Sequence, residues 1–182
     1  MEKIEREIKC CQKCGALPKP NCDSVKIGKK NIMVVGESPA KNGWLVSGKA
    51  FYDVNGKLQA TGKVLEKLLN LKGLSIEDIY FTECCKCNVS DRSRLEECTT
   101  NCREFLLKQI EKSPCEIILT MGVFASQVVL NQKIKAFKDF VGKEFKIAFG
   151  LKIKKVIPIY HPSPINPKGF AQNKEIFLGF DF

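Results

Sequence analysis

Short apolar runs alternate along this chain with longer segments of helical periodicity, and this alternation is its strongest constraint on the fold. Apolar runs of strand length occupy Asn31–Gly36, Asp78–Cys84 and Glu116–Met121. After each run, apolar residues recur at three- or four-residue spacing, as they do on the buried face of a helix. The expected helices cover residues 61–71, 95–111 and 123–130.

The C-terminal part continues the pattern. Lys143–Phe149 and Lys152–Tyr160 flank Gly150, which predicts a hairpin whose second arm enters the sheet, and the tail is expected to be helical from about Phe170. Such an alternation predicts an α/β fold, an open sheet with helices on both faces. Ligands bind these sheets beyond the carboxyl ends of the strands, so the functional residues should follow the strands.

The length of the chain, 182 residues, suits one globular domain with its own core, and we expect a single domain over residues 1–182. Its longest apolar stretches have strand length, far below the roughly 18 residues that cross a bilayer. The charged N-terminus MEKIEREIKC lacks the apolar stretch of a signal peptide. We therefore expect no membrane partner and a cytoplasmic location.

The formal net charge of +10 is concentrated at the two ends of the chain. Residues 1–30 carry 8 basic and 4 acidic side chains, residues 31–132 carry 12 of each, and residues 133–182 carry 10 and 4. If the ends meet in space, they form a positive face suited to a phosphate backbone. A generally lysine-rich surface is the alternative.

Ten cysteines without a signal peptide favour metal ligation over a disulfide framework, because a reducing cytosol keeps thiols free. They fall into three groups, which suggests one site assembled from distant parts of the chain. The groups are Cys10, Cys11, Cys14 and Cys22; Cys84, Cys85 and Cys87; and Cys98, Cys102 and Cys115.

Two loops that follow predicted strands carry candidate binding residues. GESPA at 36–40 follows the first strand, and SGKAF at 47–51 brings Phe51, which either stacks on a flat ring or anchors the loop to the core. YHPSP at 160–164 follows the last strand and holds His161, the single histidine. A neutral imidazole there could donate a hydrogen bond to negative charge on a leaving group; a structural histidine is the alternative.

Five segments, GESPA, SGKAF, YFTECCKC, the REFLLKQIE that follows a cysteine, and YHPS, resemble in order the iron–sulfur uracil-DNA glycosylases, most closely family four. The resemblance covers nearly the whole chain. It implies a three-layer α/β/α fold around a central, mostly parallel four-stranded sheet. It also implies a monofunctional DNA base glycosylase of base excision repair, with uracil as the default base, DNA as partner and a four-iron, four-sulfur (4Fe–4S) cluster. We further expect a monomer.

The resemblance places the four cluster ligands on Cys11, Cys14, Cys87 and Cys102. Thiolates are the ligands of such clusters, and the spacing is not the paired CxxC pattern of a zinc ribbon. A zinc ion in the same four-thiolate site stays an alternative. Cys10 could also replace its neighbour Cys11 as a ligand.

The same resemblance assigns roles around the flipped base. His161 would stabilise the departing base anion. The acidic residues that usually follow the first loop are absent from this chain, so a carboxylate that activates water would come from elsewhere, from Glu37 or from Asp53. The residues expected to contact the base are Gly36, Ser38, Pro39, Ala40, Phe51, Glu83 and Ser163. Lysines and arginines at both ends would hold the DNA backbone, and residues 164–168 would press on the duplex.

Three departures from the family pattern bear on specificity. Glu83 stands where the family has the asparagine that reads uracil, and an ionised carboxylate only accepts hydrogen bonds. It would suit two adjacent donors, such as the N–H edge of guanine, whereas a protonated Glu83 would mimic part of the amide. Lys41 and Asn42 replace acidic residues, and extra residues lie within 53–59. The alternatives are a glycosylase for another base and a non-catalytic nucleic-acid-binding protein.

Overall fold

The computed structural model describes residues 1–15, 17–20 and 22–180 and contains a six-stranded sheet in the order β1-β3-β2-β4-β6-β5. Its four central strands, β3, β2, β4 and β6, are parallel, and β1 and β5 pair antiparallel at the edges. The predicted parallel four-stranded centre is confirmed, and two edge strands extend it. The strands are β1 Val25–Lys26, β2 Ile32–Gly36, β3 Tyr80–Glu83, β4 Ile117–Met121, β5 Phe145–Phe149 and β6 Lys152–Ile159.

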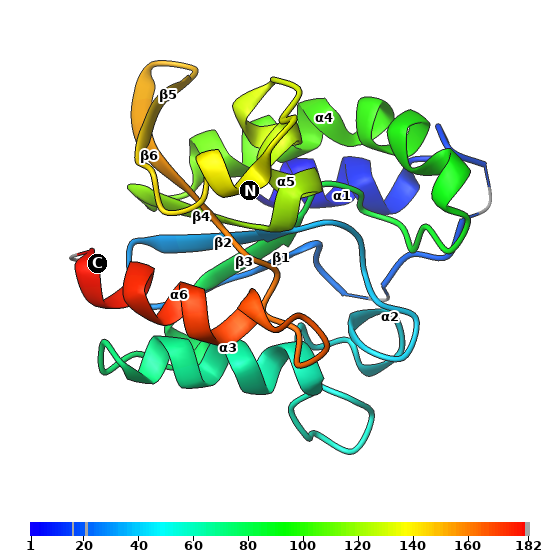
Figure 1. Ribbon diagram of the computed structural model, residues 1–182. Coiled ribbons are helices and arrows are strands. Elements are labelled where there is room, and N and C mark those ends of the chain that lie inside the picture. The colour runs from blue at the N-terminus through cyan, green and yellow to red at the C-terminus, as the bar shows by residue number, and fades with distance from the viewer. Residues whose placement is uncertain (16, 21, 181–182) are drawn as a thin grey trace.

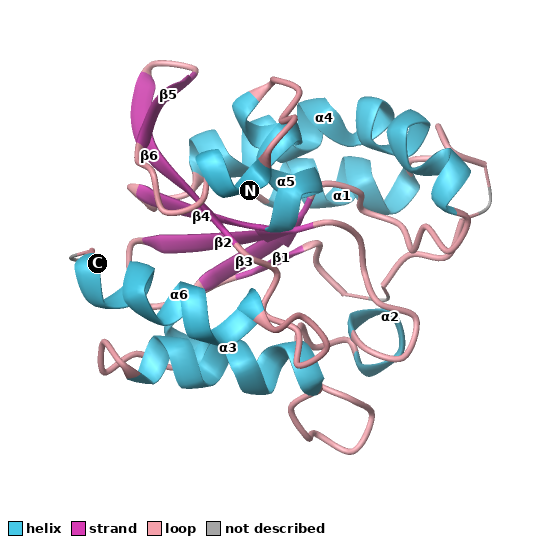
Figure 2. Cartoon of the chain, in the orientation of Figure 1, coloured by secondary structure: helices cyan, strands magenta, loops and turns pink. Residues whose placement is uncertain are grey.

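Helices cover both faces of the sheet. In Figures 1 and 2, α1, α4 and α5 lie on one face and α3 and α6 on the other, so the chain forms the expected three layers. The short α2 lies beside the end of the sheet where β2 finishes. The helices are α1 Glu2–Cys10, α2 Trp44–Ser47, α3 Ala60–Asn70, α4 Leu95–Lys112, α5 Gly122–Leu130 and α6 Lys168–Gly179.

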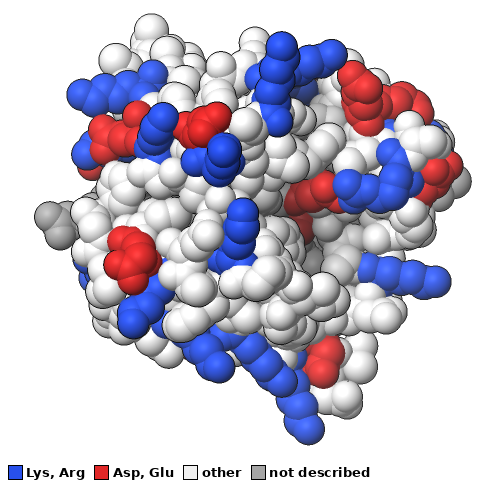
Figure 3. Space-filling view, in the orientation of Figure 1, with Lys and Arg blue, Asp and Glu red and all other residues white. Residues whose placement is uncertain are grey.

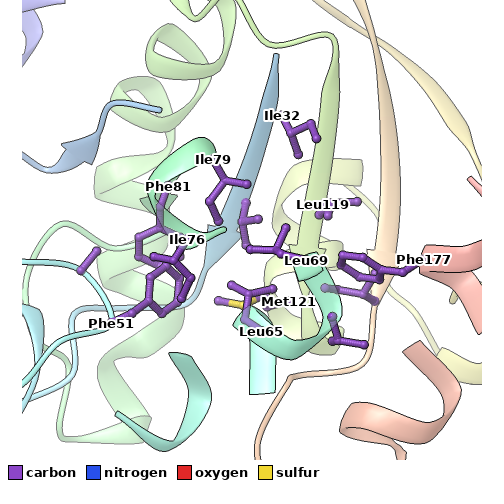
Figure 4. Packing of buried hydrophobic residues seen from close by; sticks show 14 of the residues in the cluster. Ile32, Phe51, Leu65, Leu69, Ile76, Ile79, Phe81, Leu119, Met121 and Phe177 are labelled. Atoms are coloured by element: carbon purple, nitrogen blue, oxygen red, sulfur yellow. The ribbon is translucent and has the colours of Figure 1, made fainter. Parts of the chain in front are cut away.

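Side chains alternate between the two faces of the sheet along each strand, so a hydrophobic core forms on each face. Successive side chains of β2 point to opposite faces, so Ile32 and Val34 pack in one core and Met33 and Val35 in the other. The first core includes apolar residues of α3 and Phe177 of α6, as Figure 4 shows. The second includes residues of α4 and α5. All four β2 side chains are buried, which explains the continuous apolar run in the sequence.

The N-terminal helix α1, like the short elements β1 and α2, was not predicted by the sequence patterns. Ile4 and Ile8 pack beside Phe105 of α4, and the carboxylate of Glu5 is buried with them. A charged residue on the buried face weakens the apolar periodicity from which a helix is recognised. α1 therefore depends on its tertiary contacts with α4.

The two basic ends of the chain are each spread over more than one part of the fold. α1 packs against α4 on one face of the sheet and α6 against α3 on the other, but β5, within the basic C-terminal part, also packs against α4. One positive face formed by both ends stays a prediction. Figure 3 shows lysine and arginine side chains spread over this view of the molecule, interspersed with fewer acidic ones. None of the described helices has the length and apolar character needed to span a bilayer.

Candidate active site

A cavity of about 620 Å³ opens at the carboxyl ends of the parallel strands. β2, β3 and β4 end at its wall with Gly36, Glu83 and Met121, and the loop after β6 adds His161. This is where an open α/β sheet binds ligands, and the volume is typical of a small-molecule pocket. The predicted site residues that line it are Gly36, Glu37, Ser38, Ala40, Phe51, Glu83 and His161.

Gly36 lets the floor of the cavity close around Glu83. The two residues are register partners in the parallel β2–β3 pair. A Cβ atom on Gly36 would lie 3.1 Å from the Phe81 ring, 3.2 Å from Glu83 Oε1 and 3.3 Å from the Met121 methyl group. Glycine is therefore the residue type that this close approach requires.

Glu83 presents a buried carboxyl group at the cavity floor, and its side chain is 8% exposed. Among the described residues, its Oε2 is the buried side-chain oxygen or nitrogen without a hydrogen-bond partner. Burial raises the pKa of Glu83 well above its usual value; nearby Glu37 raises it further, while Lys86 opposes the shift. The Lys86 ammonium donates to the backbone carbonyl of Glu83, so it fixes the end of β3 without pairing the carboxyl group.

Glu37 and Arg92 form an ion pair at the cavity wall. The Arg92 guanidinium donates to both carboxylate oxygens of Glu37, with Nη2 3.1 Å from Oε2. The bond to Glu37 raises the pKa of Arg92, which stays charged. The predicted water-activating carboxylate thus lines the cavity with a cation beside it.

His161 lies in a loop whose backbone is held in place. Its carbonyl oxygen accepts hydrogen bonds from the Ser163 amide at 2.8 Å and from Asn166 Nδ2 at 3.1 Å. Desolvation by the surrounding protein lowers the pKa of the imidazole, and Glu37 opposes the shift. The ring is therefore neutral at pH 7 and can donate a hydrogen bond into the cavity. The start of α5 at Gly122 borders the same space.

Phe51 lines the cavity and also packs in the core, so it anchors its loop, and its stacking on a flat ring stays a prediction. Its ring centroid lies 4.3 Å from that of Phe81 at an interplanar angle of 50°, and Figure 4 shows the two rings close together. The backbone φ of Phe51 is 70°, an uncommon conformation for a non-glycine residue. The loop therefore holds the ring at one place in the cavity wall.

Three of the sequence candidates do not line the cavity. The Pro39 carbonyl accepts a hydrogen bond from Asn88 Nδ2 at 2.6 Å, and the Ser163 hydroxyl accepts one from the Ile165 amide at 3.3 Å, so both stabilise their own loops. Asp53 accepts hydrogen bonds from the backbone amides of its own exposed turn. Asp53 is therefore not positioned to activate water in this cavity.

Sequence patterns missed the charged and polar residues that complete the wall. Arg92 carried one available signal, because it lies in the segment that follows β3, nine residues after Glu83. Gln59 belongs to the segment 53–59 that looked like an insertion, and Thr61 lies two residues after it. The further lining residues are Trp44, Gln59, Ala60, Thr61, Phe81, Arg92, Met121, Gly122, Val123 and Phe124.

The four candidate cluster ligands lie within electrostatic range of one another. Burial raises the pKa of Cys87 to about 11, with further contributions from Cys102, Cys14 and Cys11. Two nitrogen donors lie near ligand sulfurs: the Lys86 amide 3.4 Å from Cys102 Sγ and Asn101 Nδ2 3.4 Å from Cys14 Sγ. Among the described residues, no three acidic, histidine or cysteine side chains converge on a single metal ion.

The other six cysteines have different surroundings. Cys10 is exposed at the end of α1, whereas Cys11 is half-buried. Cys84 and Cys115 pack in the core beneath α4 and α5. Cys98 hydrogen-bonds the Cys14 thiol. Cys85 lies 3.1 Å from the Thr99 hydroxyl, and Cys22 accepts a hydrogen bond from the Trp44 indole at 3.0 Å.

Comparison with known proteins gives a consistent result. A type-4 uracil-DNA glycosylase of Archaeoglobus fulgidus is 32% identical over 172 residues, 91% of this chain and 82% of that protein. A type-4 uracil-DNA glycosylase of Thermotoga maritima is 30% identical over 90% of this chain and 81% of that protein. A type-5 enzyme of Pyrobaculum aerophilum is 28% identical over 74% and 62%. A sequence model of the uracil DNA glycosylase superfamily matches residues 22–179, and the chain belongs to this superfamily.

Proposed function

We propose that this protein hydrolyses the N-glycosidic bond of a damaged base in DNA, with uracil as the default base. The observation that carries the proposal is the cavity itself, which brings Glu37, Phe51, Glu83 and His161 to the carboxyl ends of the parallel strands. The superfamily match and the type-4 relatives support the same activity. An enzyme of this kind acts on the genome, so we place it in the cytoplasm with DNA as its partner, and as a monomer.

In this mechanism the base leaves the duplex and enters the cavity against Phe51. The bond between the sugar C1′ and the base nitrogen breaks, and the electron pair leaves with the base. His161, neutral at pH 7, donates a hydrogen bond to the departing anion, and the N-terminus of α5 beside it contributes positive potential. Water adds to C1′ and loses a proton, and Glu37 is the carboxylate placed to orient that water.

We also propose that Cys11, Cys14, Cys87 and Cys102 hold a 4Fe–4S cluster. The donor set suits such a cluster, because thiolates are its ligands, the four thiols lie within electrostatic range of one another, and nitrogen donors lie near two of them. Bound there, the cluster would cross-link the N-terminal segment to the end of β3 and to α4. Cys10, exposed and outside this group, is the weaker candidate.

Cys87→Ser tests the cluster assignment. We expect the variant to lose iron and the visible absorbance of the cluster, because one thiolate of four is gone. Cys115→Ser is the matched control, since Cys115 is buried in the second core, beyond the C-terminal end of α4. Iron and sulfide analysis of both purified proteins is the measurement. A Cys87→Ser protein with full iron content would contradict the assignment, and bound zinc would favour the alternative metal.

Abasic-site cleavage tests the activity. Oligonucleotides that contain uracil, hypoxanthine or xanthine are incubated with the protein and then cleaved with alkali. We expect product from uracil DNA. Absence of product from all three, with salt-sensitive DNA binding retained, would favour a non-catalytic binding protein, to which the ion-paired state of Glu37 lends support.

A further inference from the structure

The carboxyl group of Glu83 makes no hydrogen bond or ion pair with the part of the protein that the structure describes. Its Oε2 is buried and without a hydrogen-bond partner among the described residues, and the group lies at the floor of the cavity. Buried polar groups in proteins are nearly always paired, so an unpaired one at a cavity wall points to a ligand that completes it.

The surroundings of Glu83 favour the uncharged form. The ionisable groups that face it are Glu37 from the end of β2, Lys86 from the end of β3, and Arg92 and His161 across the cavity. Arg92 pairs with Glu37, and Lys86 donates to the Glu83 backbone, the Thr82 hydroxyl and the Gln109 amide oxygen. None of these cations bonds the Glu83 carboxyl oxygens in the described structure. Burial without a partner therefore favours a bound proton.

We propose that Glu83 works as a neutral carboxylic acid and pairs with the lactam edge of the flipped base, the adjacent ring N–H and carbonyl that uracil and hypoxanthine share. The acid has one O–H donor and one carbonyl acceptor, which match that edge. An ionised Glu83 would have two acceptors and would select two adjacent donors, as on guanine. The inference rests on the proposed function and specifies how the pocket chooses its base.

Rigid placement supports this reading. The Cys84 amide donates to the Gly36 carbonyl at 3.0 Å, and the Cys85 amide to the Glu37 carbonyl at 2.9 Å, so pairing between the two chain segments continues past the ends of β2 and β3. The absence of a Cβ on Gly36 leaves room for the carboxyl group. A side chain that recognises the base discriminates better between bases when it is held at the end of a strand than when it lies on a mobile loop.

The test uses binding, so it does not depend on turnover. The probes are two DNA duplexes with a non-cleavable 2′-fluoro nucleotide, uracil in one and guanine in the other, each opposite a baseless spacer. Variants are Glu83→Gln and Glu83→Met, and Glu175→Gln on exposed α6 is the matched control. At pH 7 we expect Glu83→Met to lose about 30-fold in uracil affinity, equivalent to two buried hydrogen bonds, and Glu83→Gln to recover most of that loss. Guanine also carries a ring N–H beside a carbonyl, so its probe serves to detect the ionised form of Glu83.

The pH dependence separates the two forms of Glu83. In the wild type the ratio of uracil affinity to guanine affinity should decline as pH rises through the raised pKa of Glu83, because the ionised group loses the donor that uracil needs but can still accept from two adjacent N–H groups of guanine. Glu83→Gln, measured on the same two probes, corrects for the titration of the bases themselves and should not share this decline. A wild-type ratio that does not decline relative to that of Glu83→Gln, or Glu83→Gln binding uracil no better than Glu83→Met, would overturn the proposal.

Two further results keep this test independent of folding and of activity. If Glu83→Met does not fold, the infrared difference between wild type and Glu83→Gln at pH 7 should contain the carbonyl band of a protonated carboxyl group. Absence of this band would also overturn the proposal. Failure to release any base would instead refute the proposed function and leave the binding comparison valid.

Discussion

His161 is the single histidine of the chain, so its ionisation can be followed without ambiguity. Desolvation lowers the pKa of His161, so its ring is neutral at pH 7, and the proposed mechanism uses this neutral form as the hydrogen-bond donor. The rate of base excision should therefore fall as pH is lowered through this pKa. We expect His161→Ala to lose about 10²- to 10³-fold in single-turnover rate, as for loss of a donor to developing negative charge.

The measurement pairs those rates, over a range of pH, with an NMR titration of the one imidazole. The rate and the imidazole signal of the wild type should change at the same pH. Circular dichroism of His161→Ala should match the wild type, because the backbone carbonyl of residue 161, not its ring, makes the loop hydrogen bonds. An unchanged rate in the variant would remove His161 from the mechanism.

Glu83 also links stability to pH. Its pKa is raised in the folded protein, so the folded state binds this proton more tightly than the unfolded state does. Stability is then lost as pH rises above the carboxyl pKa of the unfolded chain, about 4.3. We expect Glu83→Gln to gain in melting temperature relative to the wild type as pH rises from 4 to 8, measured by thermal unfolding of the cluster-loaded protein. Exposed Glu175→Gln should show no such trend, and a trend of opposite sign would mean an ionised Glu83.

At the scale of the elements, α1 is held by a buried hydrogen-bond network rather than by apolar periodicity alone. The Glu5 carboxylate accepts from the Ser24 amide at 2.6 Å and from Gln109 Nε2 at 2.7 Å. Gln109 in turn accepts from Thr82 at 2.8 Å and from Lys86 at 2.6 Å. The network thus joins α1 to α4 and to the end of β3, next to the cysteine group.

Glu5→Ala should destabilise the fold by about 3 kcal/mol, because it leaves buried donors unpaired. Chemical denaturation is the measurement, and Glu7→Ala, on the exposed side of α1, is the control expected to change stability little. α1 ends at Cys10, directly before Cys11, so Glu5→Ala should also retain less iron. Equal stability of the two variants would show that α1 does not need the network.

At the scale of the whole molecule, the basic residues nearest the cavity should contribute most to DNA binding. Lys168 begins α6 just after the His161 loop, with its ammonium 5.5 Å from the centre of the Tyr160 ring. Lys152 is equally exposed but begins β6, so it lies about 25 Å away, a full eight-residue strand from the cavity end.

We expect Lys168→Gln to weaken DNA binding and to reduce the slope of log affinity against log salt by about 0.9, the loss of one phosphate contact. Lys152→Gln should leave both nearly unchanged. Fluorescence anisotropy over a salt series measures this. Equal effects of the two substitutions would mean that the net charge of +10 attracts DNA as a whole, and that Lys168 makes no specific contact with a DNA phosphate.

Local patterns in the sequence determined the elements and the position of the site. β2, β3 and β4 follow from apolar runs that are buried on both faces, and β6 from a run whose C-terminal half is buried. Loops after β2 and β6 carry cavity residues because parallel strands end at one edge. The helix α1 could not be predicted from these patterns, because its buried Glu5 is stabilised by hydrogen-bond partners far along the chain.

Tertiary structure alone decided the electrostatics of the site and the distribution of its charges. The ion pair of Glu37 with Arg92, the unpaired carboxyl group of Glu83 and the lowered pKa of His161 depend on atoms that chain folding brings together from distant segments. The same holds for the terminal helices α1 and α6, which the topology places on opposite faces of the sheet. Protonation and charge pairing depend on burial and on distance in space. Neither quantity can be read from the spacing of residues along the chain.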